Sequence, residues 1–332
     1  MRKTVSIATF LCFGAAGLMF CTAPLNAAPA GGDREAIYGR AKKELPADLY
    51  AVYRIIDRIA RANGLDETPW RVIISPKYDV NAFASEINLI SMFAGMLDQM
   101  AGDPSAVACV VGHEMAHHVK RHIPLSESKD VAVVSQVNNE VATAAEQEAQ
   151  SSRDAVKPKV FTGALLQGVG QLLGGGIGGL GAGLGGHLLG GAQQRLQEGQ
   201  QRIQQLQASK EATIKERRLE ISRTHEFEAD RYGYEYMARA GFEPEGCLRT
   251  LTVLSRIPGS EFDSTHPAVP RRIEVMKGLF GELPAATLMR EGKSRLDAIA
   301  PLSYSKSQDG KSLRINSRKG GSTSDSIDRM FR

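Results

Sequence analysis

His113, Glu114 and His117 form an H-E-x-x-H motif, in which two imidazoles four residues apart accompany a carboxylate. On a helix, residues i and i+4 share one face, so both histidines can offer a ring nitrogen to one Zn²⁺ ion at about 2.0–2.1 Å. Glu114 lies one residue further round, where it can reach a zinc-bound water. Zinc lowers the pKa of that water toward about 7, and the carboxylate can pass its proton to a leaving amine. The motif therefore predicts peptide-bond hydrolysis with one Zn²⁺ per chain.

A third ligand is expected because catalytic zinc usually takes three protein ligands and keeps one position open. Glu226 and Asp230 share one face of a long helical pattern that ends at Gly241. We predict that Glu226 binds zinc, and that Asp230 accepts a hydrogen bond from the far nitrogen of a ligating histidine. Glu228 lies about 200° round the helix and is expected to point elsewhere.

These motifs resemble a known family. H-E-x-x-H followed far downstream by E-x-x-A-D, here residues 226–230, resembles the zinc metallopeptidases that include HtpX, BepA, the Oma-type peptidases and the CAAX prenyl endopeptidases (metallopeptidase family forty-eight), in a soluble exported bacterial branch. The resemblance covers about residues 33–280. It implies an α+β, mostly helical, zincin-like metallopeptidase domain, with an H-E-x-x-H active-site helix and a small β-sheet that forms the substrate edge.

Two further segments carry the resemblance. Asn81-Ala82-Phe83-Ala84 resembles the family's strand at the edge of the active-site cleft, and Ser264-Thr265-His266-Pro267, followed by Arg272, resembles its T-H-P element. By this resemblance His266 approaches the zinc-bound water or the substrate oxyanion. Arg272 would support either the substrate or the helix that carries Glu226 and Asp230. The sequence departs from the family at residues 85–88, where a glycine-rich turn is usual.

Residues 1–27 are typical of a secretory signal, in which two basic residues precede an apolar stretch that ends in small residues. The apolar run of about 16 residues is short for a membrane anchor, which needs about 20. Phe20 argues against lipidation of Cys21, because the residue before a lipidated cysteine is normally small. We therefore expect an exported, periplasmic protein.

Charge and cysteine content exclude little. The net charge of +4 becomes +2 once the signal is removed, which gives no argument for a nucleic-acid partner. Cys109 and Cys247 would remain after export. They can form a disulfide in an oxidising compartment, or Cys109 can be a buried packing residue of the zinc helix.

Apolar spacing predicts a helix over residues 33–62, interrupted at Pro46, and a strand at Trp70–Ser75. With the regions around residues 81 and 89, this strand suggests a small sheet packed against the zinc helix. An extended peptide could add to the edge of that sheet through backbone hydrogen bonds.

An insertion at residues 126–195 separates the two zinc motifs. Its flanks look helical, and 14 of the 29 residues from 163 to 191 are glycine, with no charged residue. A lone helix there is disfavoured, because each interior glycine costs about 0.8–1.0 kcal/mol relative to alanine. A flexible cover over the active site, a tightly packed hairpin and a membrane-associated segment remain open.

Residues 283–332 are basic and are expected to form a mobile tail, with Asp309-Gly310 turning a small hairpin. The spacing of His118 and His122 from the motif, and the direction of His225, exclude these histidines from the predicted site. The domain organisation is then a signal at 1–27, a zinc metallopeptidase domain at 33–282 and this tail.

The expected function is that of a zinc-dependent endopeptidase that hydrolyses unfolded or misassembled envelope proteins in periplasmic quality control. The substrate class comes from the resemblance alone. The alternative is a chaperone-like protein that binds clients and has latent or secondary protease activity. A zinc aminopeptidase also uses H-E-x-x-H, and only the E-x-x-A-D resemblance argues against it.

Overall fold

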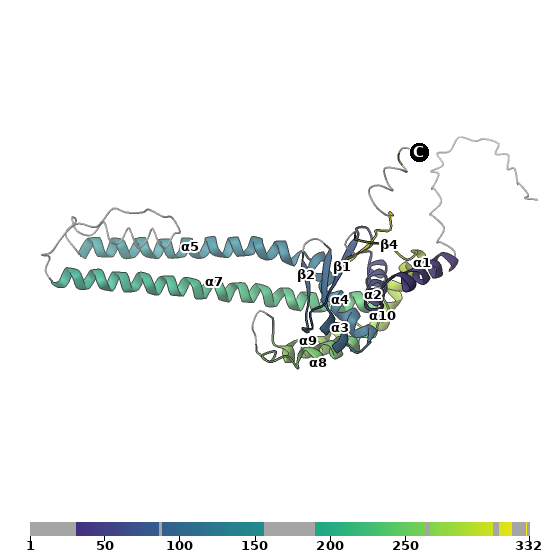
Figure 1. The fold of residues 1–332 in the computed structure, drawn as a ribbon. Helices are drawn as coiled ribbons and strands as arrows, with labels where there is room; N and C mark the ends of the chain where they lie inside the picture. Colours follow the sequence, from purple (N-terminus) through teal and green to yellow (C-terminus); the bar gives the residue numbers. More distant parts are fainter. Residues whose placement is uncertain are drawn as a thin grey trace, which may run out of the picture.

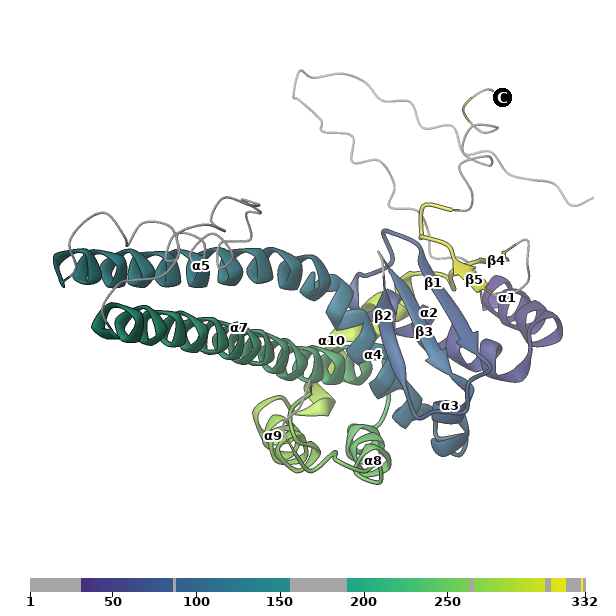
Figure 2. The ribbon, with the colours of Figure 1, turned by 60° about the vertical axis from the view of Figure 1, so that its left-hand side comes forward.

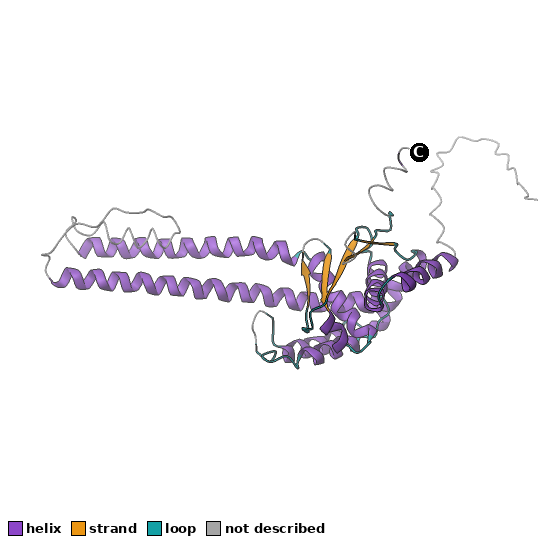
Figure 3. Cartoon of the chain, in the orientation of Figure 1, coloured by secondary structure: helices purple, strands orange, loops and turns teal. Residues whose placement is uncertain are grey.

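The structure is a computed structural model that describes residues 31–85, 88–155, 190–262, 266–307, 312–320 and 330. Helices predominate, and one small sheet stands among them (Figures 1 and 3). The helices are α1 (Gly31–Glu44), α2 (Ala47–Asn63), α3 (Ala94–Gln99), α4 (Pro104–Val119), α5 (His122–Ala155), α7 (Gly190–Arg239), α8 (Glu245–Leu254), α9 (Val269–Glu282) and α10 (Ala285–Ala298). The strands are β1 (Trp70–Ser75), β2 (Ala82–Ser85), β3 (Leu89–Phe93), β4 (Tyr304–Lys306) and β5 (Ser312–Ile315).

The first two helices follow the predicted pattern. Pro46 precedes α2, and Gly64 ends it in the left-handed region at φ 71°, a conformation that glycine adopts without a steric penalty. The apolar face of α2 is fully buried, through Val52, Tyr53, Ile56 and Ile59. This helix therefore forms a central part of the core on which α4 and α10 pack.

The sheet has the strand order β2-β3-β1-β5-β4. β1 pairs with β3 in parallel, and β2 pairs with β3 antiparallel, with Ala84 opposite Ile90. β2 is thus an edge strand, on the side of the sheet nearest the long helices (Figure 2). Asn88, the residue directly before β3, has a φ of 58°. Asparagine tolerates this left-handed conformation better than most residues, so it serves where the family resemblance led us to expect glycine.

Helices α5 and α7 run side by side away from the sheet as a two-helix arm (Figures 1 and 2). At about 1.5 Å per residue, the 50 residues of α7 correspond to about 75 Å. Val137 and Val141 of α5 are buried, and Arg218 of α7 pairs with Asp130 of α5 at 3.2 Å. The predicted helical flanks of the insertion are confirmed, whereas most of its glycine-rich segment lies outside the described residues.

The prediction of a mobile tail after residue 283 is wrong for most of its length. α10 packs against α2 and α7, and β5 pairs antiparallel with β1. Leu313 and Ile315 are fully buried, and the hydroxyl of Tyr53 donates to the carbonyl of Leu302 at 2.6 Å. The predicted hairpin forms as β4 and β5, although its Asp309-Gly310 turn is outside the described residues. The segment completes the sheet because its few apolar residues alternate toward the core, despite its basic composition.

None of the described helices combines the length and the apolar character needed to cross a bilayer. The predicted signal at residues 1–27 lies outside the part of the chain that the structure describes.

Candidate active site

The H-E-x-x-H motif lies on α4, whose first turn is capped by a side chain. The carboxylate of Asp103 accepts hydrogen bonds from the backbone N–H groups of Ser105 and Ala106, and Pro104 occupies the first turn. These contacts satisfy helix donors that would otherwise have no partner. The following apolar residues, among them Ala108, Val111 and Met115, are fully buried. α4 is therefore a core helix that presents its two histidines from a fixed backbone.

Two glycines let α4 and α7 approach closely. A Cβ atom on Gly233 of α7 would lie 2.7 Å from the backbone nitrogen of His113, and one on Gly112 would lie 2.6 Å from the carbonyl oxygen of Gly233. Ordinary contacts to a Cβ are 3.4 Å or longer. The helix that carries Glu226 can thus lie directly against the helix that carries the histidine pair.

His113, His117 and Glu226 come together at this crossing, and their potential ligand atoms all lie within 4.8 Å of one another. The two Nε2 atoms are 3.1 Å apart, and each is 3.5 Å from a carboxylate oxygen of Glu226. Two ligands of a tetrahedral zinc ion lie about 3.3–3.4 Å apart when each bond is about 2.0–2.1 Å. The 3.5 Å distances of His113 and His117 are to different oxygens of Glu226, Oε2 and Oε1. The three groups thus lie close to the spacing of three ligands around one zinc ion.

The carboxylate of Glu226 gives an independent test of this fit. Within the described chain, its buried Oε2 atom accepts no hydrogen bond of good geometry, although Nδ1 of His266 lies 3.0 Å away and Nη1 of Arg272 lies 3.9 Å away. A buried carboxylate oxygen without a hydrogen bond is costly unless a cation compensates it. Two imidazoles and one carboxylate are also a ligand set that zinc accepts. The residues present thus fit a zinc ion.

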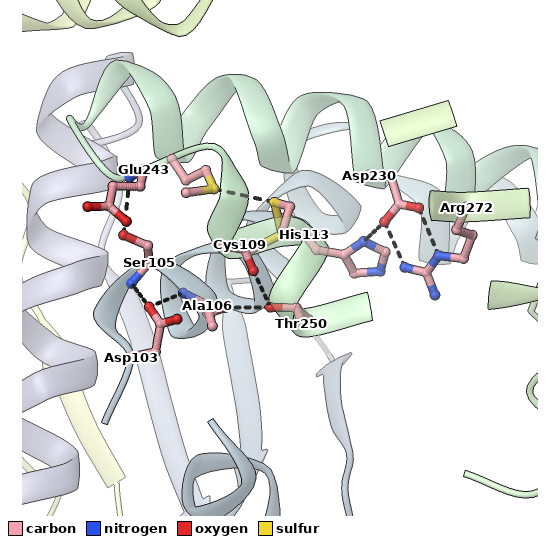
Figure 4. The surroundings of a disulfide bond; sticks show 12 residues. Asp103, Ser105, Ala106, Cys109, His113, Asp230, Glu243, Thr250 and Arg272 are labelled. Atoms are coloured by element: carbon pink, nitrogen blue, oxygen red, sulfur yellow. Dashed lines mark hydrogen bonds and ion pairs between the residues drawn. A yellow bond between two sulfur atoms is a disulfide. The ribbon is translucent and has the colours of Figure 1, made fainter. Parts of the chain in front are cut away.

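Asp230 supports the first histidine as predicted from the motif. Its Oδ1 lies 3.0 Å from Nδ1 of His113, and Arg272 donates two hydrogen bonds to the same carboxylate, at 2.7 and 2.8 Å (Figure 4). Burial opposes the charge of Asp230, but Arg272 and His113 hold the pKa of its carboxyl at about 2. The resemblance left two roles open for Arg272, support of the substrate or support of the helix that carries Glu226 and Asp230. The structure shows the contact with this helix.

The pKa values of the two histidines are shifted in opposite directions. Burial opposes the charge of His113, yet its contacts with Asp230 and Glu226 raise its pKa to about 10. Burial and the nearby charge of His113 lower the pKa of His117 to about 3. Metal binding requires both rings to be neutral at the ligating nitrogen, so a zinc ion would displace a proton from this pair.

Glu114 lies beside His113, His117 and Glu226, together called the zinc trio below, and against the sheet. Burial, reinforced by the charge of Glu226, raises the pKa of its carboxyl to about 7 despite the opposing effect of His113, and the carboxylate accepts a hydrogen bond from the backbone of Ala84. A carboxylate with a pKa near neutrality is suited to take up and release a proton. The structure thus places the predicted base between the metal site and the edge strand β2.

A cleft of about 190 Å³ opens next to these groups. The polar end of the cleft is lined by His113 and Glu226 of the zinc trio, by Glu114 and by His266. The remaining wall is largely apolar and consists mainly of Met96, Val110, Leu251, Leu254 and Ile257. Asn81 and Ala82 also line it, whereas the ring of Phe83 is 43% exposed on the same edge. The predicted substrate-edge segment therefore borders the cleft.

His266 approaches the site from the segment that leads into α9. Its side chain is 62% exposed, and its Nδ1 contacts Glu226, a predicted metal ligand, at 3.0 Å. The predicted role at the water or the oxyanion stays a prediction. The preceding Ser264 and Thr265 lie outside the described residues.

Cys109 and Cys247 form a disulfide between α4 and α8 (Figure 4). Both residues are buried in the core. Cys109 lies one helical turn before His113 and lines the cleft. The sequence allowed two interpretations of Cys109, a disulfide partner or a buried packing residue, and the structure shows both. The bond ties the zinc helix to the helix that supplies Leu251 and Leu254 to the apolar wall.

Two histidines and one carboxylate near the site escaped the sequence interpretation. His122, excluded by its spacing, lies with its Nδ1 3.0 Å from Nδ1 of His117, and its Nε2 is 3.1 Å from the carboxylate of Glu228. His225 stacks on His122 at 4.4 Å between ring centroids. The spacing of i and i+5 gives no signal for this contact on a continuous helix, because it depends on a turn between α4 and α5.

Helix α4, with the H-E-x-x-H motif, and helix α7, with Glu226, together form a metallopeptidase site. The model of peptidase family M48 matches residues 46–279, and the chain belongs to this family. A mitochondrial metalloendopeptidase OMA1 from Arabidopsis thaliana is 33% identical over 72 residues, which are 22% of this chain and 15% of that protein. The chain thus matches only a small part of that relative's length. No solved structure matches significantly.

Proposed function

We propose that this M48 peptidase is a zinc endopeptidase that cleaves unfolded or misassembled proteins of the bacterial envelope. The observation that carries the proposal is that the ligand trio, Glu114 and an apolar cleft lie together beside β2, the edge strand of the described sheet. An edge strand can bind any extended backbone through its N–H and C=O groups. An apolar cleft favours side chains that folded proteins bury, so an unfolded segment satisfies both requirements.

In the proposed mechanism, His113, His117 and Glu226 hold the metal. Bound zinc would act as a Lewis acid and lower the pKa of water. Glu114 takes the proton of the attacking water and transfers it to the leaving amine, a role that suits its raised pKa. Asp230 holds His113 in the tautomer that leaves Nε2 free for the metal. His266, exposed beside the cleft, is the candidate donor to the oxyanion.

The location and the membrane contact belong to the same proposal. A buried disulfide suits an oxidising compartment such as the periplasm, which agrees with the secretory pattern at residues 1–27. The uncharged, glycine-rich composition of residues 163–191 supports a contact with a membrane or a cover over the cleft. Deleting these residues tests the gating role, which fails if a folded deletion variant keeps the protease activity and substrate choice of the wild type.

The first experiment measures zinc content and cleavage of casein by the chain without residues 1–27. Glu114→Gln should keep the zinc and the fold but lose cleavage, and a chelator should abolish cleavage by the wild type. Glu282→Gln, an exposed site on α9 that pairs with Arg231, is the matched control and should cleave normally. Cleavage retained in Glu114→Gln would refute the assigned base.

A second candidate, client binding with latent or secondary protease activity, rests on the arm and the exposed sheet edge. The Glu114→Gln variant separates the two candidates, because a chaperone-like protein would still suppress aggregation of a denatured client and rescue a deletion strain. Peptides blocked at their N-terminus separate an endopeptidase from an aminopeptidase, since only the former cleaves them.

A further inference from the structure

A chain of contacts extends outward from the zinc trio. It begins at His117, whereas Asp230 contacts the other histidine, His113. It runs from Nδ1 of His117 to Nδ1 of His122, 3.0 Å away, and from Nε2 of His122 to the carboxylate of Glu228, 3.1 Å away. A carboxylate can only accept, so Nε2–H of His122 donates to Glu228. With His122 neutral, its Nδ1 is an acceptor, and Nδ1–H of His117 donates to it. This arrangement leaves Nε2 of His117 without a proton, facing His113 and Glu226.

The opposite proton arrangement is incompatible with metal binding. If His122 carried a proton on Nδ1 as well, it would donate to Nδ1 of His117, and a neutral His117 would then carry its proton on Nε2. That nitrogen is the one that lies 3.1 Å from Nε2 of His113 and 3.5 Å from Glu226. The acceptor role of His122 is therefore the one that agrees with a metal at the trio.

The backbone between α4 and α5 has an unusual conformation that permits the contact between His117 and His122. α4 ends at Val119, and Arg121 has a φ of 58°. A non-glycine residue in this left-handed region is uncommon, because the Cβ atom crowds the backbone there. The turn between α4 and α5 places the ring of His122, the first residue of α5, next to the ring of His117. Residue i+5 of a continuous helix would not reach this position. Such a conformation persists only where the surrounding contacts determine it.

The surroundings of His122 fix the orientation of its ring. The residue is 3% exposed, and the ring of His225 stacks on it with an interplanar angle of 5°. His225 and Glu228 both belong to α7, which also carries Glu226 and Asp230. α7 thus holds the ring of His122 at the base of the arm, and His122 in turn contacts His117 on α4.

We infer that His122 is a positioning residue for the metal: it accepts the proton of Nδ1 of His117, fixes the tautomer and orientation of that ligand, and is itself held by Glu228. The inference rests on the proposed zinc site. His113 and His117 then each have their own support, Asp230 for the first and His122 for the second. Losing a partner of this kind typically weakens metal binding about 10–100-fold.

The test compares zinc dissociation constants, measured by competition with a chelating dye, for the wild type and variants of the chain without residues 1–27. His122→Ala should bind zinc about 10–100-fold more weakly. His122→Asn should recover most of the affinity, because its side-chain oxygen can accept in place of Nδ1. Glu282→Gln, the exposed site on α9 that pairs with Arg231, is the control and should bind zinc within about twofold of the wild type.

A second readout reports the geometry of the site. The absorption spectrum of the Co²⁺-substituted protein should change in His122→Ala and return toward the wild type in His122→Asn, a rescue that lost packing alone would not produce. Unaltered zinc affinity and an unaltered Co²⁺ spectrum in His122→Ala would overturn the inference. Failure of the wild type to bind zinc would instead refute the proposed function, so the two failures are distinguishable.

Glu228→Leu provides the test if His122→Ala does not fold. The Glu228 side chain is 40% exposed, so its replacement is tolerated by the packing. Without this acceptor, His122 is free to reorient, and zinc affinity should fall several-fold. An affinity equal to that of the wild type in a folded Glu228→Leu protein would contradict the inference.

Discussion

The contact between α4 and α7 at Gly233 permits a sharp test of how the site is assembled. In Gly233→Ala, the new methyl group would lie 2.7 Å from the backbone nitrogen of His113 and 2.8 Å from its Cα atom. Both atoms belong to the backbone and cannot rotate away. Restoring an ordinary contact of 3.4 Å to the nearer atom requires the helices to separate by about 0.7 Å.

This separation acts directly on the zinc trio, because His113 lies on one helix and Glu226 on the other. Functional groups must be held within about 0.5 Å of their productive geometry, and a misplacement of about 1 Å can cost about 100-fold in rate. We therefore expect zinc affinity and kcat/KM each to fall about 10–100-fold. Overpacking should also lower the free energy of unfolding by about 1–3 kcal/mol, partly offset by the better helix propensity of alanine.

Gly278→Ala is the matched control. Gly278 lies within α9, and a Cβ atom there would meet nothing within 4 Å, so the change should raise stability by up to about 1 kcal/mol through helix propensity and leave zinc binding unchanged. Zinc titration, casein cleavage and urea unfolding of both variants complete the assay. Wild-type zinc affinity and activity in Gly233→Ala would refute the idea that the two helices set the ligand geometry.

Three further predictions concern stability. Reducing the Cys109–Cys247 bond, which spans 138 residues, should lower the free energy of unfolding of the metal-free protein by up to about 5 kcal/mol; with a slope of about 3 kcal/mol/M the urea midpoint would fall by about 1.5–2 M, and an unmoved midpoint would contradict this. Arg272→Met leaves the buried Asp230 without its bidentate partner and should cost about 3–5 kcal/mol in urea unfolding; a cost below about 1 kcal/mol would argue against a stabilising pair. Burial and the nearby Asp57 raise the pKa of Tyr38 from 10.0 to about 12; its protonated form therefore stabilises the fold fully below about pH 10, and this contribution, at most about 2.7 kcal/mol, is lost as the pH rises through about 12. Tyr38→Phe should remove this alkaline loss from the stability profile, and an unchanged profile would exclude Tyr38 as its source.

Local signals made part of the structure predictable. The capping residue Asp103 with Pro104 marked the start of α4, and Gly241, at φ 82°, followed the end of the ligand-bearing helix. Four-residue spacing identified the pairs His113 with His117 and Glu226 with Asp230, because such spacing places residues on one helical face. These features depend on a few neighbouring residues and can be read from one sequence.

Features that depend on distant pairing or on one unusual dihedral angle were not predictable in this way. β4 and β5 are only three and four residues long, and the pairing of β5 with β1 joins segments more than 200 residues apart. The contact of His122 with His117 requires the positive φ of Arg121, for which arginine gives no sequence signal. The distance between the two cysteines likewise depends on how α8 packs on α4.

The wide spacing of the site residues along the chain has a consequence for synthesis. Glu226 follows His117 by 109 positions, and Arg272 comes 46 positions later. At about 5–20 residues per second, a ribosome needs roughly 8–30 seconds to progress from the second histidine to the supporting arginine. A nascent or truncated chain that ends before residue 226 contains the histidine pair and the base but not the third ligand. All the residues of the proposed site are therefore present only when most of the chain has been made.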